Sequence, residues 1–221
     1  AGSGGGVSSG GYHSIASERL IPAMADILVL YYSARGSVRQ LADVLARGVD
    51  SVPGMRARVR TVPRVAPVTQ QAAEPAVPPE GAPYVEPNDL AECAGLAMGS
   101  PTRFGNMAAP MKHFVDSLAG EWTRGTLEGK PAAVFTSSST MHGGQETTLV
   151  TMMVPLLHHG MVIVGLPYSL PDLHSTRGGG SPYGASHVAG AAGDLPVSEE
   201  ERRLAFALGK RLAETAAKLS R

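Results

Sequence analysis

The fold is decided by the stretch Ala94-Gly95-Leu96-Ala97-Met98, which runs directly into Gly99-Ser100-Pro101-Thr102-Arg103-Phe104-Gly105-Asn106-Met107. An apolar run ends abruptly in a polar, turn-prone loop, and the loop opens into a helical pattern. Two other segments share this design: residues 27–32 run into Ser33–Ser37, and residues 132–135 run into Thr136–Gln145. Polar loops at the carboxyl ends of neighbouring parallel strands converge on one crevice, which is where open α/β sheets bind ligands. The sequence therefore predicts a binding site as well as a fold.

Strands and helices are predicted to alternate along the chain. Short apolar runs predict five strands, at residues 26–32, 56–61, 96–99, 132–136 and 161–164. Apolar residues at helical spacing predict helices at 38–49, 107–118 and 146–157. In the last of these, Pro155 predicts a kink or an end. Segments 62–88 and 165–197 are expected to be long loops. This alternation predicts a doubly wound α/β fold, with a flavodoxin-like five-stranded parallel sheet of order 2-1-3-4-5 and helices on both faces.

The last helix carries its own start signal. Ser198 and Glu201 have the spacing of a capping box, in which each side chain accepts a hydrogen bond from the other residue's backbone. The apolar positions that follow are predicted to be buried, namely Leu204, Leu208, Leu212 and Leu219.

Composition narrows the class of protein. The 221 residues, 43% of them hydrophobic, suit one domain with a sizeable core. The 19 basic and 19 acidic residues balance, so a nucleic-acid partner is not expected. No apolar stretch approaches the roughly 20 residues that span a bilayer. The single cysteine, Cys93, excludes an internal disulfide framework and favours a reducing compartment, so we expect a cytoplasmic protein.

The first 23 residues differ from the rest. They are rich in glycine and serine and have no hydrophobic periodicity, and they lack the basic and apolar regions of a signal peptide. We expect residues 1–23 to be a disordered leader or a remnant of cloning, with Met24 as the native start. Residues 24–221 then form the folded domain.

The loop Ser33–Val38 has the properties of a phosphate site. It offers two hydroxyls, the flexible Gly36 and backbone N–H groups at a helix start, where the helix dipole favours an anion. The alternative is an ordinary turn in which a serine hydroxyl caps the helix. The loop lacks a P-loop lysine, and no G-x-G-x-x-G follows the first strand, so a nucleoside triphosphate or a Rossmann dinucleotide is disfavoured.

The other two loops suit a flat ligand. In Gly99–Met107, Pro101 stiffens a backbone against which a ring could lie, although Phe104 could equally pack in the core with Arg103 in solvent. Thr136–Gln145 combines hydroxyls with glycines that allow a ligand to approach the backbone closely. The alternative interpretation of this segment is a mobile loop.

Two adjacent histidines, His158 and His159, precede the fifth predicted strand. A metal site is disfavoured because no cysteine or carboxylate stands at ligand spacing, and no metal is expected. For His159 we favour a histidine that interacts with the dipole at the end of a helix.

Five motifs are characteristic when taken together. They are Leu28-Val29-Leu30-Tyr31-Tyr32-Ser33, Gly99–Met107, Gly143-Gly144-Gln145-Glu146-Thr147, His158-His159-Gly160-Met161-Val162 and Arg177-Gly178-Gly179-x-x-Pro182-Tyr183-Gly184-Ala185. With these motifs the chain resembles, in unbroken order over roughly residues 25–221, the WrbA family of FMN-dependent NAD(P)H:quinone oxidoreductases, which have a flavodoxin-like fold.

The resemblance implies a set of FMN-binding residues. Residues 33–38 would hold the phosphate, and the two later loops would hold the isoalloxazine and ribityl parts. His158 matches the family's flavin-contacting histidine, and Trp122 matches the aromatic wall of the substrate space. The full set implied for FMN is Ser33, Ala34, Arg35, Gly36, Ser37, Val38, Pro101, Thr102, Arg103, Phe104, Gly105, Ser137, Ser138, Ser139, Thr140, Gly143, Gly144 and His158.

The resemblance also implies the reaction and the assembly. NADH or NADPH would be the co-substrate, quinones would be reduced by two electrons in a ping-pong reaction, and the complete site would draw on neighbouring subunits of a homotetramer. Two features differ from some members: Arg35 replaces an aromatic residue, and the loop with Met141-His142 is one residue longer. The alternatives are an FMN-binding electron carrier or regulatory module without quinone turnover, and a scaffold that binds no FMN.

Overall fold

The computed structural model describes residues 1–2, 24–66, 78 and 80–220, and within this part a parallel sheet forms the centre. Its strands pair in the order β2-β1-β3-β4-β5, and β6 also pairs with β4. The predicted order 2-1-3-4-5 is confirmed. Most of the leader predicted for residues 1–23 lies outside the described residues. The strands are β1 (Ala25–Tyr31), β2 (Met55–Thr61), β3 (Gly95–Pro101), β4 (Pro131–Ser138), β5 (Val162–Ile163) and β6 (Ala185–Val188).

The far edge of the sheet differs from the prediction, because the sheet has six strands. The predicted strand 161–164 contracts to β5, which pairs only with Pro131 and Ala132 at the start of β4. The predicted long loop 165–197 contains β6, which pairs with Phe135–Ser138 at the other end of β4. One edge position is thus shared by two short strands. Residues 164–184 leave the sheet between them and include the short helix α6 (Asp172–Ser175).

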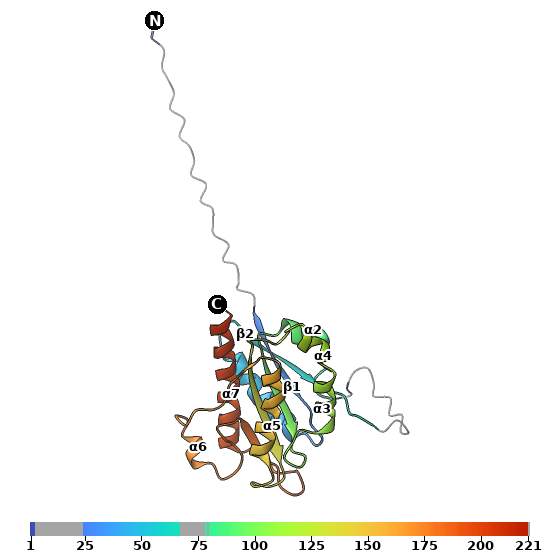
Figure 1. Ribbon diagram of the computed structural model, residues 1–221. Coiled ribbons are helices and arrows are strands. Elements are labelled where there is room, and N and C mark those ends of the chain that lie inside the picture. The colour runs from blue at the N-terminus through green and yellow to red at the C-terminus, as the bar shows by residue number, and fades with distance from the viewer. Residues whose placement is uncertain (3–23, 67–77, 79, 221) are drawn as a thin grey trace.

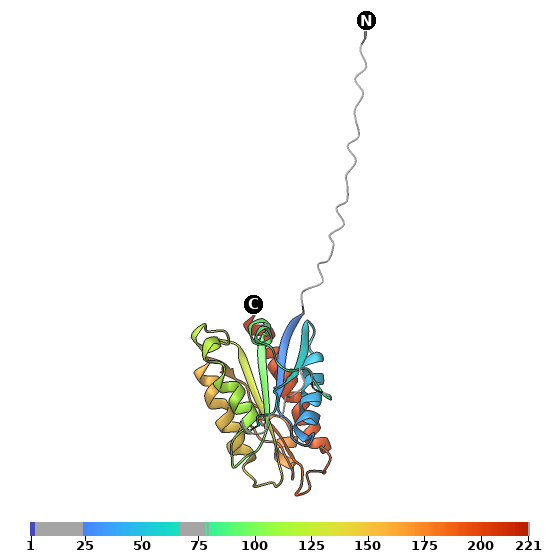
Figure 2. The ribbon, with the colours of Figure 1, turned by 90° about the vertical axis from the view of Figure 1, so that its right-hand side faces the viewer.

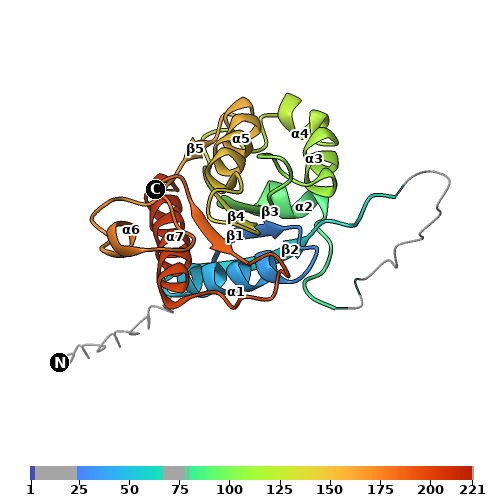
Figure 3. The same cartoon turned by 90° about the horizontal axis from the view of Figure 1, so that it is seen from below.

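Helices cover both faces of the sheet (Figures 1 and 2). Figure 3 shows α1 and α7 on one face and α2, α3, α4 and α5 on the other. Trp122 lies in α4, a short helix. These helices are α1 (Ser37–Asp50), α2 (Pro87–Glu92), α3 (Ala109–Asp116), α4 (Ala119–Thr123), α5 (Gln145–His158) and α7 (Glu199–Leu219).

Strand β1 connects the two cores. Its alternating side chains point to opposite faces of the sheet. Ile27 and Val29 belong to the core under α1 and α7, whereas Leu28 and Leu30 belong to the core under α3 and α5, and all four are fully buried. Cys93 is also buried, as expected for a packing residue, and burial raises the pKa of its thiol.

Two helix ends test the sequence predictions. The capping box of α7 is confirmed, because the Ser198 hydroxyl accepts from Glu201 N at 3.2 Å and the Glu201 carboxylate accepts from Ser198 N at 2.8 Å. The prediction that Leu219 is buried is wrong, because this residue ends the helix and is 52% exposed. Of the kink or end predicted at Pro155, the end is wrong. Helix α5 runs on to His158, and the Pro155 carbonyl accepts from His159 N at 3.1 Å.

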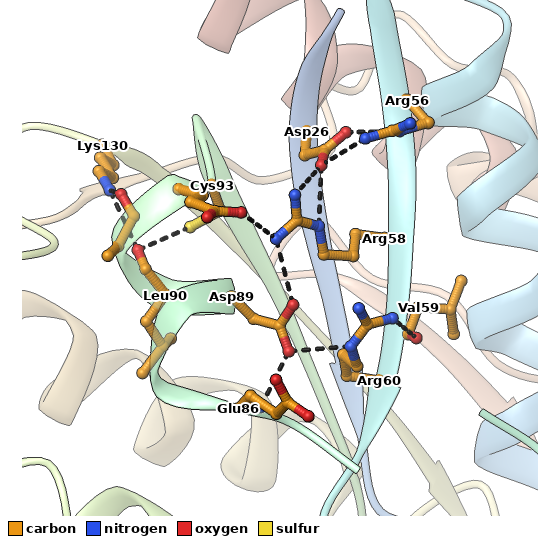
Figure 4. A network of polar contacts seen from close by, with 12 residues as sticks. Asp26, Arg56, Arg58, Val59, Arg60, Glu86, Asp89, Leu90, Cys93 and Lys130 are labelled. Atoms are coloured by element: carbon orange, nitrogen blue, oxygen red, sulfur yellow. Dashed lines mark hydrogen bonds and ion pairs between the residues drawn. The ribbon is translucent and has the colours of Figure 1, made fainter. Parts of the chain in front are cut away.

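A polar network ties β2 to its neighbours at the amino end of β1 (Figure 4). Asp26 accepts from Arg56 Nε at 2.7 Å, Arg56 Nη2 at 2.8 Å and Arg58 Nε at 2.8 Å. Arg58 and Arg60 also bind Asp89 of α2, at 3.2 and 2.8 Å. The hydrogen bonds from Arg56 and Arg58 hold the pKa of the buried Asp26 carboxyl below its ordinary value, against the effect of burial.

Replacing Asp26→Asn should lower the free energy of unfolding at pH 7 by about 1–3 kcal/mol, because it removes the buried carboxylate that Arg56 and Arg58 share, although Arg58 keeps Asp89 and Glu92 as partners. The pKa of Asp26 is lower in the folded chain than its unfolded value of about 3.9, so its contribution is complete above that value and disappears as the pH falls through the folded pKa. Urea unfolding should therefore show a smaller stability difference between the wild type and the variant at pH 3 than at pH 7.

The control for this prediction is Asp116→Asn. Asp116 pairs with Lys112 on the exposed surface of α3, so its loss should change stability by less than about 1 kcal/mol. An Asp26→Asn protein as stable as the wild type at pH 7 would contradict the prediction.

Candidate functional site

The three predicted polar loops meet in one crevice at the carboxyl ends of β1, β3 and β4. Its volume is about 340 Å³, within the range of small-ligand sites. A fourth segment, after β6, completes the wall. The lining residues are Ser33, Ala34, Arg35, Ser37, Val38, Pro101, Thr102, Arg103, Ser137, Ser138, Ser139, Ala189, Ala191 and Gly193.

The β1–α1 loop presents an open helix N-terminus. Gly36 is the N-cap of α1 with φ +93°, a conformation that favours glycine, and no side chain caps the helix. Ser33 Oγ accepts from Gly36 N at 3.0 Å, so this hydroxyl closes the turn before the helix rather than capping the helix itself. A Cβ on Gly36 would meet no atom within 4 Å. Ser37 and Val38, which begin the helix, line the crevice, so an uncapped helix N-terminus borders it, and such an end favours an anion.

The loop after β3 folds into a tight turn with an exposed aromatic tip. Arg103 and Asn106 exchange backbone hydrogen bonds of 2.8 and 3.0 Å. Phe104 and Gly105 between them have φ of +52° and +76°, as in a type I′ turn. Phe104 is fully exposed, so the alternative that it packs in the core is wrong. Backbone strain of this kind, about 1–3 kcal/mol at a non-glycine residue, is concentrated at ligand sites.

Hydroxyl groups connect this turn to β4 and α5. Thr136 Oγ1 donates to Ser100 O at 2.7 Å and lies 3.3 Å from Thr102 Oγ1, which in turn accepts from Thr148 Oγ1 at 3.2 Å. The N-cap of α5, Gly144, sits so close to the turn that a Cβ there would be 3.1 Å from Gly105 Cα. Glycine at position 144 thus lets the two loops approach each other.

The loop after β4 is held at both ends. Ser138 Oγ donates to Thr140 O at 2.8 Å, and Gln145 Nε2 donates to Met141 O at 2.9 Å. Ser137 and Ser138 are buried at the end of β4, whereas Ser139 and Thr140 are exposed. Gly143 and Gly144 lie beyond the residues that line the crevice.

The residues that form the fourth wall of the crevice were not predicted from the sequence. Residues 189–195, which we call the β6 turn, follow β6 directly, and Ala189 N donates to Ser138 O at 2.8 Å. Arg35 Nη1 donates to Ala192 O at 3.2 Å, which connects the β6 turn to the β1–α1 loop. The available signal was the pair of glycines, Gly190 and Gly193, in a short alanine-rich stretch. Both have positive φ.

Positive charge predominates at the end of this region next to the β1–α1 loop. Arg35 and Arg103 are the charged side chains among the crevice residues of the described chain. A neighbouring hollow of about 660 Å³ shares Ser33, Ala34 and Arg35 with the crevice and adds two arginines, Arg39 and Arg64, and one carboxylate, Glu80. An anion is therefore favoured at this end of the site.

Two predicted site residues lie elsewhere on the chain. Trp122 Nε1 donates to His158 O at 2.8 Å, and both residues line a separate hollow of about 560 Å³ between α3, α4 and α5. Gly144 and His158 mark opposite ends of α5, whose 14 residues span about 20 Å. A single chain thus does not bring His158 to the crevice. Next to it, burial lowers the pKa of His159.

The described residues contain no group of three or more histidine, cysteine, aspartate or glutamate side chains placed to hold a metal ion. Among the helices of the same ranges, none is long and apolar enough to cross a membrane.

The strand order and the crevice at the β1–β3 switch point define a flavodoxin-like protein. Solved structures share this fold. A WrbA-like flavodoxin from Agrobacterium tumefaciens matches with a TM-score of 0.61 and 18% identity, over 88% of this chain and 98% of its own. A flavodoxin from the domain Archaea matches with a TM-score of 0.57 and 18% identity, over 87% of this chain and 99% of its own.

Sequence comparison identifies the family. The family model for NADPH-dependent FMN reductase matches residues 25–172. An NAD(P)H dehydrogenase (quinone) from Geobacter sulfurreducens is 43% identical over 203 residues, which are 88% of this chain and 99% of that protein. The chain belongs to the NADPH-dependent FMN reductase family. The flavoprotein family expected from the sequence motifs is thereby confirmed.

Proposed function

We propose that the protein is an FMN-dependent NAD(P)H:quinone oxidoreductase. The family and the 43% identical NAD(P)H dehydrogenase (quinone) support this activity. The observation that carries the proposal is the uncapped N-terminus of α1 opening into the crevice, because it offers N–H groups and a helix dipole to a phosphate.

The crevice residues fit FMN. The phosphate would be held by Ser33–Val38, with Arg35 adding positive charge. The hydroxyls of Ser137–Ser139 and Thr102, together with backbone groups of the turn Arg103–Gly105, would bind and orient the polar parts of the ribityl chain and the ring. When bound, FMN would supply the redox chemistry, while the chain supplies orientation and electrostatics.

Both substrates are proposed to use the same space in turn. The crevice opens beside the exposed Phe104 ring, which offers an apolar surface to a flat molecule. NAD(P)H would enter first and leave, and the quinone would then enter, so turnover would be ping-pong. The neighbouring arginines at positions 35, 39 and 64 supply positive charge for the phosphates of the dinucleotide.

We propose a homotetramer in which Trp122 and His158 serve the crevice of a neighbouring subunit, as the family resemblance implies. Their distance from the crevice of their own chain supports this arrangement. So does the exposure of apolar side chains that line their hollow: Trp122 and Val154 are each at least half exposed. Large apolar side chains exposed together mark interaction surfaces.

We also propose the extent of the FMN-binding domain and the compartment in which the protein works. Residues 24–221 act as one FMN-binding domain, since a single sheet and two cores span the described part of this range. The protein works in the cytoplasm, which its single, buried, unpaired cysteine supports.

Changing Gly36→Val should weaken FMN binding about 10- to 150-fold, because a side chain would enter the space in front of the α1 N-terminus and disturb a charged hydrogen bond. Ser33→Ala should weaken binding in the same direction. FMN fluorescence quenching gives both affinities. Gly129→Val is the matched control, since Gly129 also has positive φ and open space around its Cβ position but lies outside the crevice. Wild-type affinity in both crevice variants would refute the phosphate assignment.

Steady-state kinetics of the FMN-loaded protein should give parallel double-reciprocal lines with NADH and benzoquinone as the varied substrates. Parallel lines follow if the two substrates occupy the same space in sequence. Intersecting lines would reject the shared space, whereas NADH oxidation that does not respond to quinone would reject the reductase and favour an electron carrier.

Trp122→Ala should leave the fold intact and raise the KM for quinone severalfold, because the indole is expected to wall the substrate space of a neighbouring subunit. Light scattering of the wild-type holoprotein should report a mass near four chains. Tyr168→Ala serves as the control, since Tyr168 is equally exposed but does not line the Trp122 hollow. A monomeric holoprotein with full quinone reductase activity would contradict the tetramer.

A further inference from the structure

A buried histidine and a buried glutamate lie directly beneath the β6 turn. His187, in β6, is 1% exposed, and Glu201, in the first turn of α7, is 2% exposed. His187 Nδ1 is 2.8 Å from Glu201 Oε2. Neither residue lines the crevice, and the proposed reaction uses neither of them directly.

The Glu201 carboxylate is a junction between three segments. Besides His187, it accepts from Gly179 N at 2.8 Å, from Val188 N at 3.0 Å and from Ser198 N at 2.8 Å. Burial raises the pKa of Glu201, but the contact with His187 and these N–H groups outweigh burial and hold the pKa below its ordinary value. The carboxylate is therefore charged and can only accept hydrogen bonds.

The second ring nitrogen of His187 also faces an acceptor. His187 Nε2 is 3.1 Å from the carbonyl oxygen of Leu195. A neutral imidazole has one N–H, so it can satisfy only one of these two acceptors. Both contacts are hydrogen bonds only if the ring carries a proton on each nitrogen, and the contact with Glu201 would then be a buried ion pair.

The His187 side chain connects both ends of the β6 turn. Residue 187 precedes the turn, and its ring reaches across to Leu195, which ends it. Within the turn, Leu195 N donates to Ala189 O at 3.0 Å and Gly193 N donates to Gly190 O at 3.1 Å. The crevice-lining residues of the turn, Ala189, Ala191 and Gly193, thus lie between His187 and the residue that its ring contacts.

We propose that His187, paired with Glu201, is a positioning residue for the cofactor: it fixes the β6 turn as the wall of the crevice. This inference rests on the proposed binding of FMN in that crevice. Burying an ion pair costs desolvation energy and seldom adds net stability over apolar packing, so the role that remains for it is to select one geometry of the turn.

His187→Gln tests the proposal, because glutamine is polar and uncharged and cannot bridge both acceptors as the imidazolium does. We expect the affinity for FMN, measured by fluorescence quenching on folded protein, to fall roughly tenfold. Without FMN, amide exchange at Leu195 should become faster than in the wild type. His113→Gln, which changes an exposed histidine of α3, should alter neither quantity.

The outcomes separate this inference from the proposed function. Wild-type protein that binds no FMN would refute the cofactor site, while amide exchange at Leu195 would still report on the ion pair. A folded His187→Gln protein with unchanged FMN affinity would overturn the positioning role. If that variant does not fold, long-range ¹H–¹⁵N spectra of the wild-type histidine rings decide: two protonated nitrogens on His187 support the ion pair, and one bare nitrogen refutes it.

Discussion

The parallel register of the central strands is the constraint on which the site depends. Tyr31, Gly99 and Phe135 pair side by side across β1, β3 and β4, and Ala185 of β6 continues the same row. The chain turns polar within two residues of this row on each strand. All four loops therefore leave the same edge of the sheet, within three residues of this row, and their backbone groups converge there. Gly99 keeps the row compact, because a Cβ there would be 2.1 Å from the Phe135 ring.

Hydrogen bonds from buried hydroxyls hold the loops around the crevice in place. Ser100 and Thr136 are fully buried, and their hydroxyls bond to backbone groups: Ser100 Oγ accepts from Ala108 N at 2.8 Å, and Thr136 Oγ1 donates to Ser100 O. Because a buried polar group is costly when it has no partner, these contacts favour one arrangement of the loops. The exposed side of the site is different. There Phe104 projects into solvent from a strained turn, where a ligand or another subunit could cover it.

Sequence patterns predict the parts of the site that depend on local chemistry. Long apolar runs mark β1, β3 and β4, and a change to hydroxyls and glycines marks the loops after them. Strand β6 was not predicted, because its sequence Ala-Ser-His-Val contains only one large apolar residue. Its pairing with β4 also joins segments about fifty residues apart, which no local pattern indicates. The capping box at Ser198 could be predicted from spacing. The contact of Glu201 with His187 could not be predicted in this way, because it forms only when β6 and α7 are packed together.

Trp122 and His158 show where sequence resemblance and the single chain diverge. Their motifs imply a flavin site, but α5 carries His158 about 20 Å from the loop at its start. The fold of one chain gives the position of each residue within that chain. A site that is completed between subunits also depends on the surfaces through which the subunits would associate. The exposed apolar side chains around Trp122 are such a surface.

We have proposed that the uncapped N-terminus of α1 binds the phosphate of FMN, and a crystal structure of the protein with FMN is the decisive test. We expect the phosphate within hydrogen-bonding distance of backbone N–H groups of Ser37 and Val38, with the ring between the turn Arg103–Asn106 and the loop after β4. A phosphate bound elsewhere, for example in the hollow beside Trp122 of the same chain, would contradict it.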